Sequence, residues 1–180
     1  MLTEVGCDPI VVVAPAGDLE RTRALELGVT IVEGGPTRQE SVANGLETIH
    51  SEIVLIHDAA RPFATVELTA DVLRAADGAE GAVPAVPVDE TIKRVDGDAV
   101  IETLDRATLL RVQTPQAFCT AVLVEAHRRA RSEGFLATDD AQLIEHFGGR
   151  VAVVRGARTN MKITYPEDFP IAETIAGGLE

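Results

Sequence analysis

The stretch Ile53-Val54-Leu55-Ile56-His57-Asp58-Ala59-Ala60-Arg61-Pro62 is the part of the chain from which fold and function are best approached. Its first four residues form a short apolar run, which is typical of a strand buried in a sheet. Asp58 follows this strand directly, and Arg61 comes three residues later. A carboxylate at a strand end is a candidate ligand for Mg²⁺, although helix caps and turns use the same residue type. The nearby Arg61 favours a site where phosphate oxygens bind.

Strand-like and helix-like segments alternate on both sides of this stretch. We expect further strands near residues 10–14, 30–32, 151–154 and 161–164, and helices near 17–27, 38–50, 66–76, 120–132, 139–147 and from Pro166. Such alternation favours right-handed βαβ crossovers and a parallel sheet. The predicted fold class is therefore α/β, with three layers around a mostly parallel, Rossmann-like sheet and with residues 1–180 in a single domain.

A β-hairpin is predicted where this alternation is interrupted, in an arm at about residues 88–111. Residues 91–95 and 100–103 form its two strands, and Asp96-Gly97-Asp98 forms the turn. A two-stranded hairpin is only marginally stable alone, so we expect it to pack against another surface. A partner subunit is a reasonable candidate.

The charge and composition exclude several classes of protein. The chain has 180 residues and a net charge of −13, which argues against binding to nucleic acid or to an anionic membrane. Its apolar runs are too short to span a bilayer, and residues 1–4 do not resemble the start of a signal peptide. Cys7 and Cys119 lack the spacing of metal ligands. We therefore expect a cytoplasmic protein with small-molecule substrates.

Two further segments offer groups that could bind phosphate. Only two of the 16 basic residues are lysines, Lys93 and Lys162, and a lysine ammonium is a compact donor to phosphate, although compositional drift would also explain them. The segment 34–41 places glycines, hydroxyls and a cation at a helix N-terminus, which favours anions. Thr37 and Glu40 also fit a capping box, and both readings are compatible. Residues 138–140 are expected mainly to cap the next helix.

Seven segments follow one another along nearly the whole chain: Gly34-Gly35 with Thr37–Val42, His57–Pro62, Thr91–Lys93, Asp105-Arg106, Gln113–Phe118, Thr138–Ala141, and Lys162–Thr164 with Pro166–Asp168. Together they closely resemble one family, the 2-C-methyl-D-erythritol 4-phosphate cytidylyltransferases. The resemblance implies an enzyme of the nucleotide-diphospho-sugar transferase-like fold. It would transfer CMP from CTP to 2-C-methyl-D-erythritol 4-phosphate, with Mg²⁺ as cofactor. The products would be pyrophosphate and 4-diphosphocytidyl-2-C-methyl-D-erythritol, an intermediate of non-mevalonate isoprenoid biosynthesis.

The resemblance also assigns roles to individual residues. It implies that the catalytic residues Arg106 and Lys162 position the attacking phosphate, and that Asp58 contacts both the metal and the substrate. The methylerythritol substrate would be bound by Arg61, Thr91 and Thr114, and the nucleotide by Gly34, Gly35 and Ser41. In this family the arm reaches into the neighbouring subunit, which implies a homodimer with shared sites.

The chain departs from the family pattern at two places. Glu90 stands where the family usually has aspartate before Thr91. The family also opens with a strand and a glycine-rich loop whose arginine and lysine hold the CTP phosphates, whereas residues 1–7 contain one glycine, Gly6, and no basic residue. We therefore expect that this first strand and loop are missing and that the chain alone transfers cytidylate poorly. Ordinary turnover in a pyrophosphate-release assay would contradict this expectation.

Two alternatives remain open at the level of sequence. One is a ribitol-5-phosphate cytidylyltransferase of similar architecture, although Ala59-Ala60 and residues 138–140 look more like the methylerythritol enzyme. The other is a non-catalytic remnant that binds a sugar phosphate or only dimerises.

Overall fold

The structure, a computed structural model, describes residues 1–178. Its strands are β1 (Val11–Ala14), β2 (Thr30–Glu33), β3 (Ile53–Ile56), β4 (Gly81–Pro87), β5 (Lys93–Asp96), β6 (Ala99–Thr103), β7 (Leu110–Val112), β8 (Gln116–Cys119) and β9 (Val151–Arg155). Its α-helices are α1 (Leu19–Arg23), α2 (Arg38–Leu46), α3 (Val66–Ala76), α4 (Thr120–Glu133), α5 (Asp140–His146) and α6 (Phe169–Gly177). Short 3₁₀ helices cover Ala16–Asp18, Arg106–Thr108 and Pro166–Asp168.

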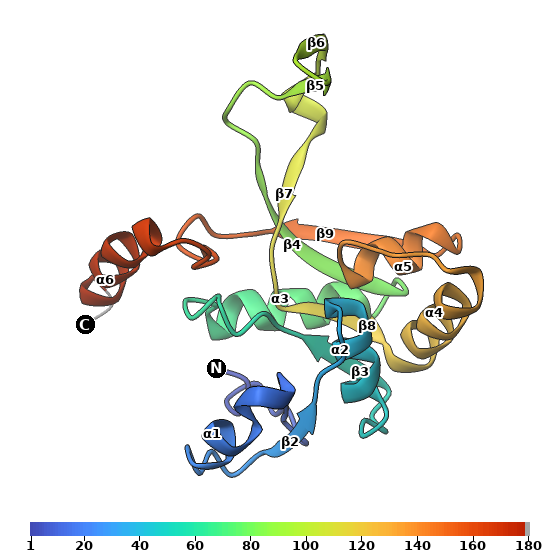
Figure 1. Ribbon diagram of the computed structural model, residues 1–180, viewed down its shortest axis with the longest axis vertical. Coiled ribbons are helices and arrows are strands. Elements are labelled where there is room, and N and C mark those ends of the chain that lie inside the picture. Colours follow the sequence, from blue (N-terminus) through green and yellow to red (C-terminus); the bar gives the residue numbers. More distant parts are fainter. Residues whose placement is uncertain (179–180) are drawn as a thin grey trace.

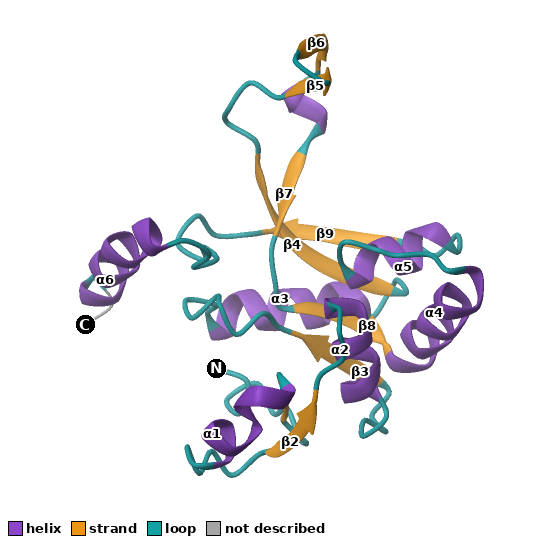
Figure 2. Cartoon of the chain, viewed as in Figure 1, coloured by secondary structure: helices purple, strands orange, loops and turns teal. Residues whose placement is uncertain are grey.

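The central sheet lies between two helical layers (Figures 1 and 2). Its strand order is β3-β8-β4-β7, with β9 on β4. Side chains alternate between the two faces of each strand, so Val54, Val83 and Phe118 pack with residues of α2, α4 and α5. Ala82 and Ala117 point the other way and pack with α3. The expected three-layer α/β architecture is confirmed.

The pairing within the sheet is more mixed than the expected, mostly parallel pattern. β4 pairs in parallel with β9, and β1 pairs in parallel with β2 in a separate sheet, but β8 runs antiparallel to both β3 and β4. The arm explains the difference, because the chain leaves the sheet at the end of β4 and returns along β7, which is antiparallel to β4. The chain then continues into β8 and inserts it between β3 and β4.

Most predicted elements are present, and β3 and α3 have the predicted bounds. The helix expected over residues 38–50 ends at Leu46, because the next N–H groups, of Thr48 and Ile49, bond to carbonyls only three residues back. The helix expected over residues 17–27 is reduced to a 3₁₀ turn and α1. The strand expected near residues 161–164 is absent; its one backbone bond to a neighbouring segment runs from Ile163 N–H to the Ala60 carbonyl, at 2.8 Å.

The strand at residues 11–14 is also less enclosed than its apolar sequence predicts. Within the described residues β1 pairs with β2, and only Ala14 of this strand is buried. Separately, no helix among residues 1–178 has both the length and the apolar character needed to cross a membrane.

The arm contains the predicted hairpin and projects far from the sheet (Figure 1). β5 and β6 pair antiparallel, with Asp96 opposite Ala99. The two residues between them form the turn, and Gly97 has a φ of 56°, a conformation that favours glycine. At the base of the arm, the exposed carboxylate of Asp89 pairs with Arg158, whose Nη1 lies 2.6 Å from Oδ2.

Candidate active site

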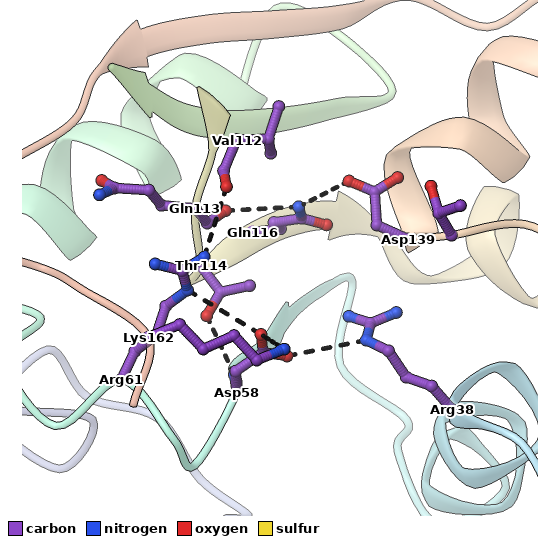
Figure 3. A pocket seen from close by; sticks show the side chains of 10 residues that line it. Arg38, Asp58, Arg61, Val112, Gln113, Thr114, Gln116, Asp139 and Lys162 are labelled. Carbon is purple, nitrogen blue, oxygen red and sulfur yellow. Dashed lines mark hydrogen bonds and ion pairs between the residues drawn. The ribbon is translucent and has the colours of Figure 1, made fainter. Parts of the chain in front are cut away.

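A pocket of about 100 Å³ opens where β3 ends (Figure 3). It is lined by Arg38, Asp58, Arg61, Val112, Gln113, Thr114, Gln116, Thr138, Asp139 and Lys162. The fold therefore brings together four residues singled out from the sequence, which come from three separate parts of the chain: Asp58, Arg61, Thr114 and Lys162. Ligands of α/β proteins bind at such strand ends, so the position agrees with the fold.

Asp58 is the electrostatic centre of the pocket, because three cations surround its carboxylate. Lys162 Nζ lies 2.9 Å and Arg61 Nε 3.9 Å from Oδ2, and Arg38 Nε lies 3.7 Å from Oδ1 (Figure 3). Burial alone would raise the pKa of Asp58, but the hydrogen bond and charge of Lys162, together with Arg38 and Arg61, outweigh burial and lower it. The pocket lining has three cations and two carboxylates, Asp58 and Asp139, so its charges leave room for an anion.

The hydroxyl of Thr114 holds this carboxylate in place through the backbone. It accepts a hydrogen bond from Asp58 N–H at 3.0 Å and also lies 3.0 Å from His57 Nδ1. Because the Arg61 carbonyl beside His57 Nε2 can only accept, Nε2 carries the proton of the neutral ring, and Nδ1 accepts from the Thr114 hydroxyl. Nε2 lies 3.1 Å from the Arg61 carbonyl and donates to it. Burial lowers the pKa of His57, in keeping with a neutral ring.

Arg61 and Asn160 join the β3 loop to the segment that carries Lys162. Arg61 Nη1 donates to the Asn160 carbonyl at 2.8 Å, and Asn160 Nδ2 donates to the Thr114 carbonyl at 2.9 Å. Asn160 is fully buried, whereas the Lys162 side chain is 44% exposed. In the strand expected near residues 161–164, alternation would place Asn160 and Lys162 on one side, but no strand forms and Asn160 turns inward to bond the backbone. Lys162 nevertheless reaches Asp58, so its predicted access to a phosphate is compatible with the structure.

Gly34, Gly35 and Ser41, predicted to bind nucleotide, lie outside the lining of this pocket and form the turn that leads into α2. Ser41 Oγ accepts a bond from Gly35 N–H at 3.1 Å and donates to the Thr37 carbonyl at 2.8 Å. A Cβ on Gly35 would lie 2.4 Å from the Glu40 Cβ, so the turn requires glycine there. The predicted capping box between Thr37 and Glu40 is confirmed. This tight turn fixes where α2 begins.

The structure does not bring Thr91 and Arg106 to the pocket of the same chain. Both are exposed on the arm, which projects away from the sheet (Figure 1). Arg106 donates a hydrogen bond to the Asp89 carbonyl at the base of the arm. Their predicted roles at the pocket stay predictions.

Sequence reasoning missed three polar residues of the pocket and its surroundings. The sequence presents Arg38 as one cation at a helix N-terminus and Gln116 as one residue of the segment Gln113–Phe118. Asp140 was assigned to helix capping, but Asp139 is the N-cap of α5, accepting from Gln142 N–H at 2.9 Å. Asp140 is 1% exposed and bonds to Arg38 at 2.8 Å. Asp139 and Asp140 are adjacent and both acidic, so the sequence alone does not show which of them is buried.

The pocket fits a divalent cation that arrives together with phosphate. Asp139, the second carboxylate lining it, is engaged by the cap and by Gln116 Nε2 at 3.1 Å, and Lys162 Nζ lies 2.9 Å from Asp58 Oδ2. Asp58 Oδ1, 3.7 Å from Arg38 Nε, is therefore the carboxylate oxygen most open to a metal. Among residues 1–178, no three His, Cys, Asp or Glu side chains gather to hold a metal. Mg²⁺ typically takes one or two carboxylates and completes its shell with substrate phosphates and water. One protein carboxylate is therefore enough for such an ion.

The fold and the pocket together define an α/β protein with a pocket of cations and carboxylates at a strand end. Comparison with known sequences makes this specific: the chain belongs to the family 2-C-methyl-D-erythritol 4-phosphate cytidylyltransferase, which residues 1–177 match. The family is one of enzymes, and the resemblance seen in the sequence motifs is confirmed.

Individual relatives agree with this assignment. The chain is 46% identical over 159 residues to the 2-C-methyl-D-erythritol 4-phosphate cytidylyltransferase of Bacillus mycoides, covering 88% of this chain and 70% of that protein. It is also 46% identical over 176 residues to the enzyme of the same name from Halalkalibacterium halodurans, covering 94% of this chain and 77% of that one.

Solved structures of the family share the fold. The 2-C-methyl-D-erythritol 4-phosphate cytidylyltransferase of Thermus thermophilus superposes with a TM-score of 0.87 at 42% identity, over 98% of this chain and 89% of that one. The 4-diphosphocytidyl-2C-methyl-D-erythritol synthase of Anaerococcus prevotii gives 0.88 at 33% identity, over 98% and 85%. These names favour the methylerythritol enzyme over the ribitol alternative.

Proposed function

We propose that this chain transfers CMP from CTP to 2-C-methyl-D-erythritol 4-phosphate, as the names of its relatives indicate, within non-mevalonate isoprenoid biosynthesis. The observation that carries the proposal is the gathering of Arg38, Arg61 and Lys162 around Asp58 in a pocket at a strand end. This arrangement supplies a local positive field in a chain whose net charge is −13.

The reaction needs positioning and charge neutralisation more than a covalent intermediate. An oxygen of the polyol phosphate attacks the α-phosphorus of CTP and forms a new P–O bond. The bond from the α-phosphorus to the oxygen that bridges it to the β-phosphorus breaks, and pyrophosphate leaves with the electron pair. Lys162 would hold the attacking phosphate, and Arg61 adds a second positive charge beside the same carboxylate oxygen of Asp58. Asp58 keeps these cations oriented.

We further propose Mg²⁺ as the cofactor, with Asp58 as its protein ligand. When bound, the ion would neutralise phosphate charge beside the cations that the chain itself provides.

A homodimer with exchanged arms is the proposed assembly. Four apolar side chains of the arm are between 47% and 60% exposed, namely Val95, Val100, Ile101 and Leu110. A second copy would bury this surface, and it would also bring Thr91 and Arg106 to the partner's pocket. Sedimentation of the wild type as a dimer, and of a variant with Val100 and Ile101 changed to serine as a monomer, would support the assembly. A wild-type monomer would contradict it. The cytoplasmic location expected from the sequence stays a prediction.

The proposed function is tested by product analysis. The chain is incubated with CTP, Mg²⁺ and either 2-C-methyl-D-erythritol 4-phosphate or ribitol 5-phosphate, and the cytidyl product is detected by mass spectrometry. We expect the wild type to form the cytidyl product with 2-C-methyl-D-erythritol 4-phosphate, and Lys162→Met to form none. A preference for ribitol 5-phosphate would contradict the proposal, and polyol binding without any product would favour the non-catalytic alternative.

A further inference from the structure

Asp140 is a buried carboxylate whose partners connect it to the pocket. It is the first residue of α5 and is 1% exposed. Its Oδ2 accepts a hydrogen bond from Arg38 Nη1 at 2.8 Å, and its Oδ1 lies 3.1 Å from Nε2 of the buried His127. A buried carboxylate needs such partners, because its desolvation is costly. One of the two is a cation that lines the pocket.

Arg38 connects two carboxylates in different surroundings. Its Nη1 is held by the buried Asp140, while its Nε lies 3.7 Å from Oδ1 of Asp58, too long for a hydrogen bond (Figure 3). Among the described residues, the bond to Asp140 is the one hydrogen bond that this guanidinium makes. A guanidinium has five N–H donors in a planar fork, so most of its donors remain for a ligand. Because Asp140 fixes one corner of this plane, the rest is directed toward the pocket.

Stability alone gives a weak reason for this arrangement. A buried ion pair often contributes little net free energy of folding, since the desolvation of both charges offsets their attraction. The capping of α5 does not require it either, because Asp139 provides the cap. Arg38 faces Oδ1 of Asp58, whereas Lys162 faces Oδ2, so the two cations lie on either side of the carboxylate.

We propose that Arg38 contacts a phosphate oxygen of the bound substrates and that Asp140 is the positioning residue that holds Arg38 for this contact. The inference rests on the proposed function and deepens it by adding a third phosphate-binding cation. The phosphate belongs either to CTP or to the polyol phosphate. Both present the same chemistry to a guanidinium, so the experiment separates the two sources.

Calorimetric titrations test the proposal, with CTP and 2-C-methyl-D-erythritol 4-phosphate titrated separately at constant Mg²⁺. The proteins are the wild type, Arg38→Gln, Asp140→Asn and the double variant. Loss of one charge-assisted hydrogen bond weakens binding about tenfold, and we expect this for Arg38→Gln with one of the two ligands. Asp140→Asn should weaken the same ligand, and the double variant should bind no more weakly than Arg38→Gln. The ligand affected identifies the phosphate.

A matched control is Arg74→Gln, which removes an exposed arginine paired with Asp71 on α3, outside the pocket lining. Its affinities should equal those of the wild type. Wild-type affinity of Arg38→Gln for both ligands would overturn the proposal. Additive losses in the double variant would overturn the positioning role of Asp140, because they would mean that Asp140 acts independently of Arg38.

Two further outcomes remain decisive. If Asp140→Asn does not fold, Arg38→Lys is tested in its place. A lysine ammonium keeps the charge but cannot bond Asp140 and a phosphate at once as the planar guanidinium does. The variant should therefore bind the affected ligand more weakly. Unchanged affinity of Arg38→Lys would then overturn the positioning role. Failure of the proposed function is recognised separately, because in that case the wild type itself binds neither ligand.

Discussion

Thr114→Val is the change that most sharply tests how Asp58 is held. Thr114 is 4% exposed, and its hydroxyl bonds both Asp58 N–H and His57 Nδ1 at 3.0 Å. Valine has nearly the same shape but no hydroxyl, so both partners lose a bond in a partly buried place. Each loss costs about 1–1.5 kcal/mol, and we expect the free energy of unfolding to fall by about 2–3 kcal/mol.

The measurement is urea unfolding at neutral pH, followed by circular dichroism, with Thr114→Ser as the control. Serine keeps the hydroxyl and loses one methyl group, so its free energy of unfolding should fall by only about 1 kcal/mol. Thr114→Val should also bind 2-C-methyl-D-erythritol 4-phosphate more weakly than Thr114→Ser, because the Asp58 backbone is no longer fixed. If the valine variant proves as stable as the serine variant, the hydrogen-bond assignment is wrong.

Three further predictions follow from the same contacts. Lys162→Met removes the main partner of Asp58, so the pKa of that carboxyl, which lies below its usual value of 3.8 in the wild type, should rise in a carbon-13 titration; an unchanged pKa would contradict the ion pair. Gly35→Ala should destabilise the chain by about 1–3 kcal/mol through the clash with Glu40, whereas Gly17→Ala, with no atom within 4 Å of the new Cβ, should be nearly neutral; equal effects in thermal unfolding would refute the packing argument. Burial lowers the pKa of His57 below its ordinary value of 6.5, so the unfolded state binds more protons than the folded state just below that pH. The free energy of unfolding should therefore decline as the pH falls through this range. In unfolding curves measured at several pH values, His57→Gln should lack the part of this decline that His57 causes.

Features encoded locally could be predicted from the sequence. Residues 53–56 and 66–76 form a strand and a helix with the predicted bounds, because apolar spacing and turn residues within a few positions determine them. The capping box of Thr37 and Glu40 is equally local. Asp58, Arg61 and Lys162 were found as candidates because their residue types and motif order carry the signal, and the pocket does bring them together.

Features that depend on distant contacts could not be predicted in this way. The antiparallel direction of β8 follows from the path of the arm, which residues 116–119 do not encode. The inward turn of Asn160 depends on the Thr114 carbonyl, 46 positions earlier, and overrides the alternation of residues 160–164. The bond between Arg38 and Asp140 spans 102 positions, and nothing near Asp140 distinguishes it from its neighbour Asp139.

The most direct test of the central claim is a crystal structure of the chain soaked with 2-C-methyl-D-erythritol 4-phosphate. The account predicts that the phosphate lies in the pocket beside Asp58, with oxygens within hydrogen-bond distance of Lys162 and of the Arg61 guanidinium. An ordered polyol phosphate bound elsewhere, for example in the groove beside α4 that includes Arg129 and Phe147, with the Asp58 pocket unchanged, would contradict it.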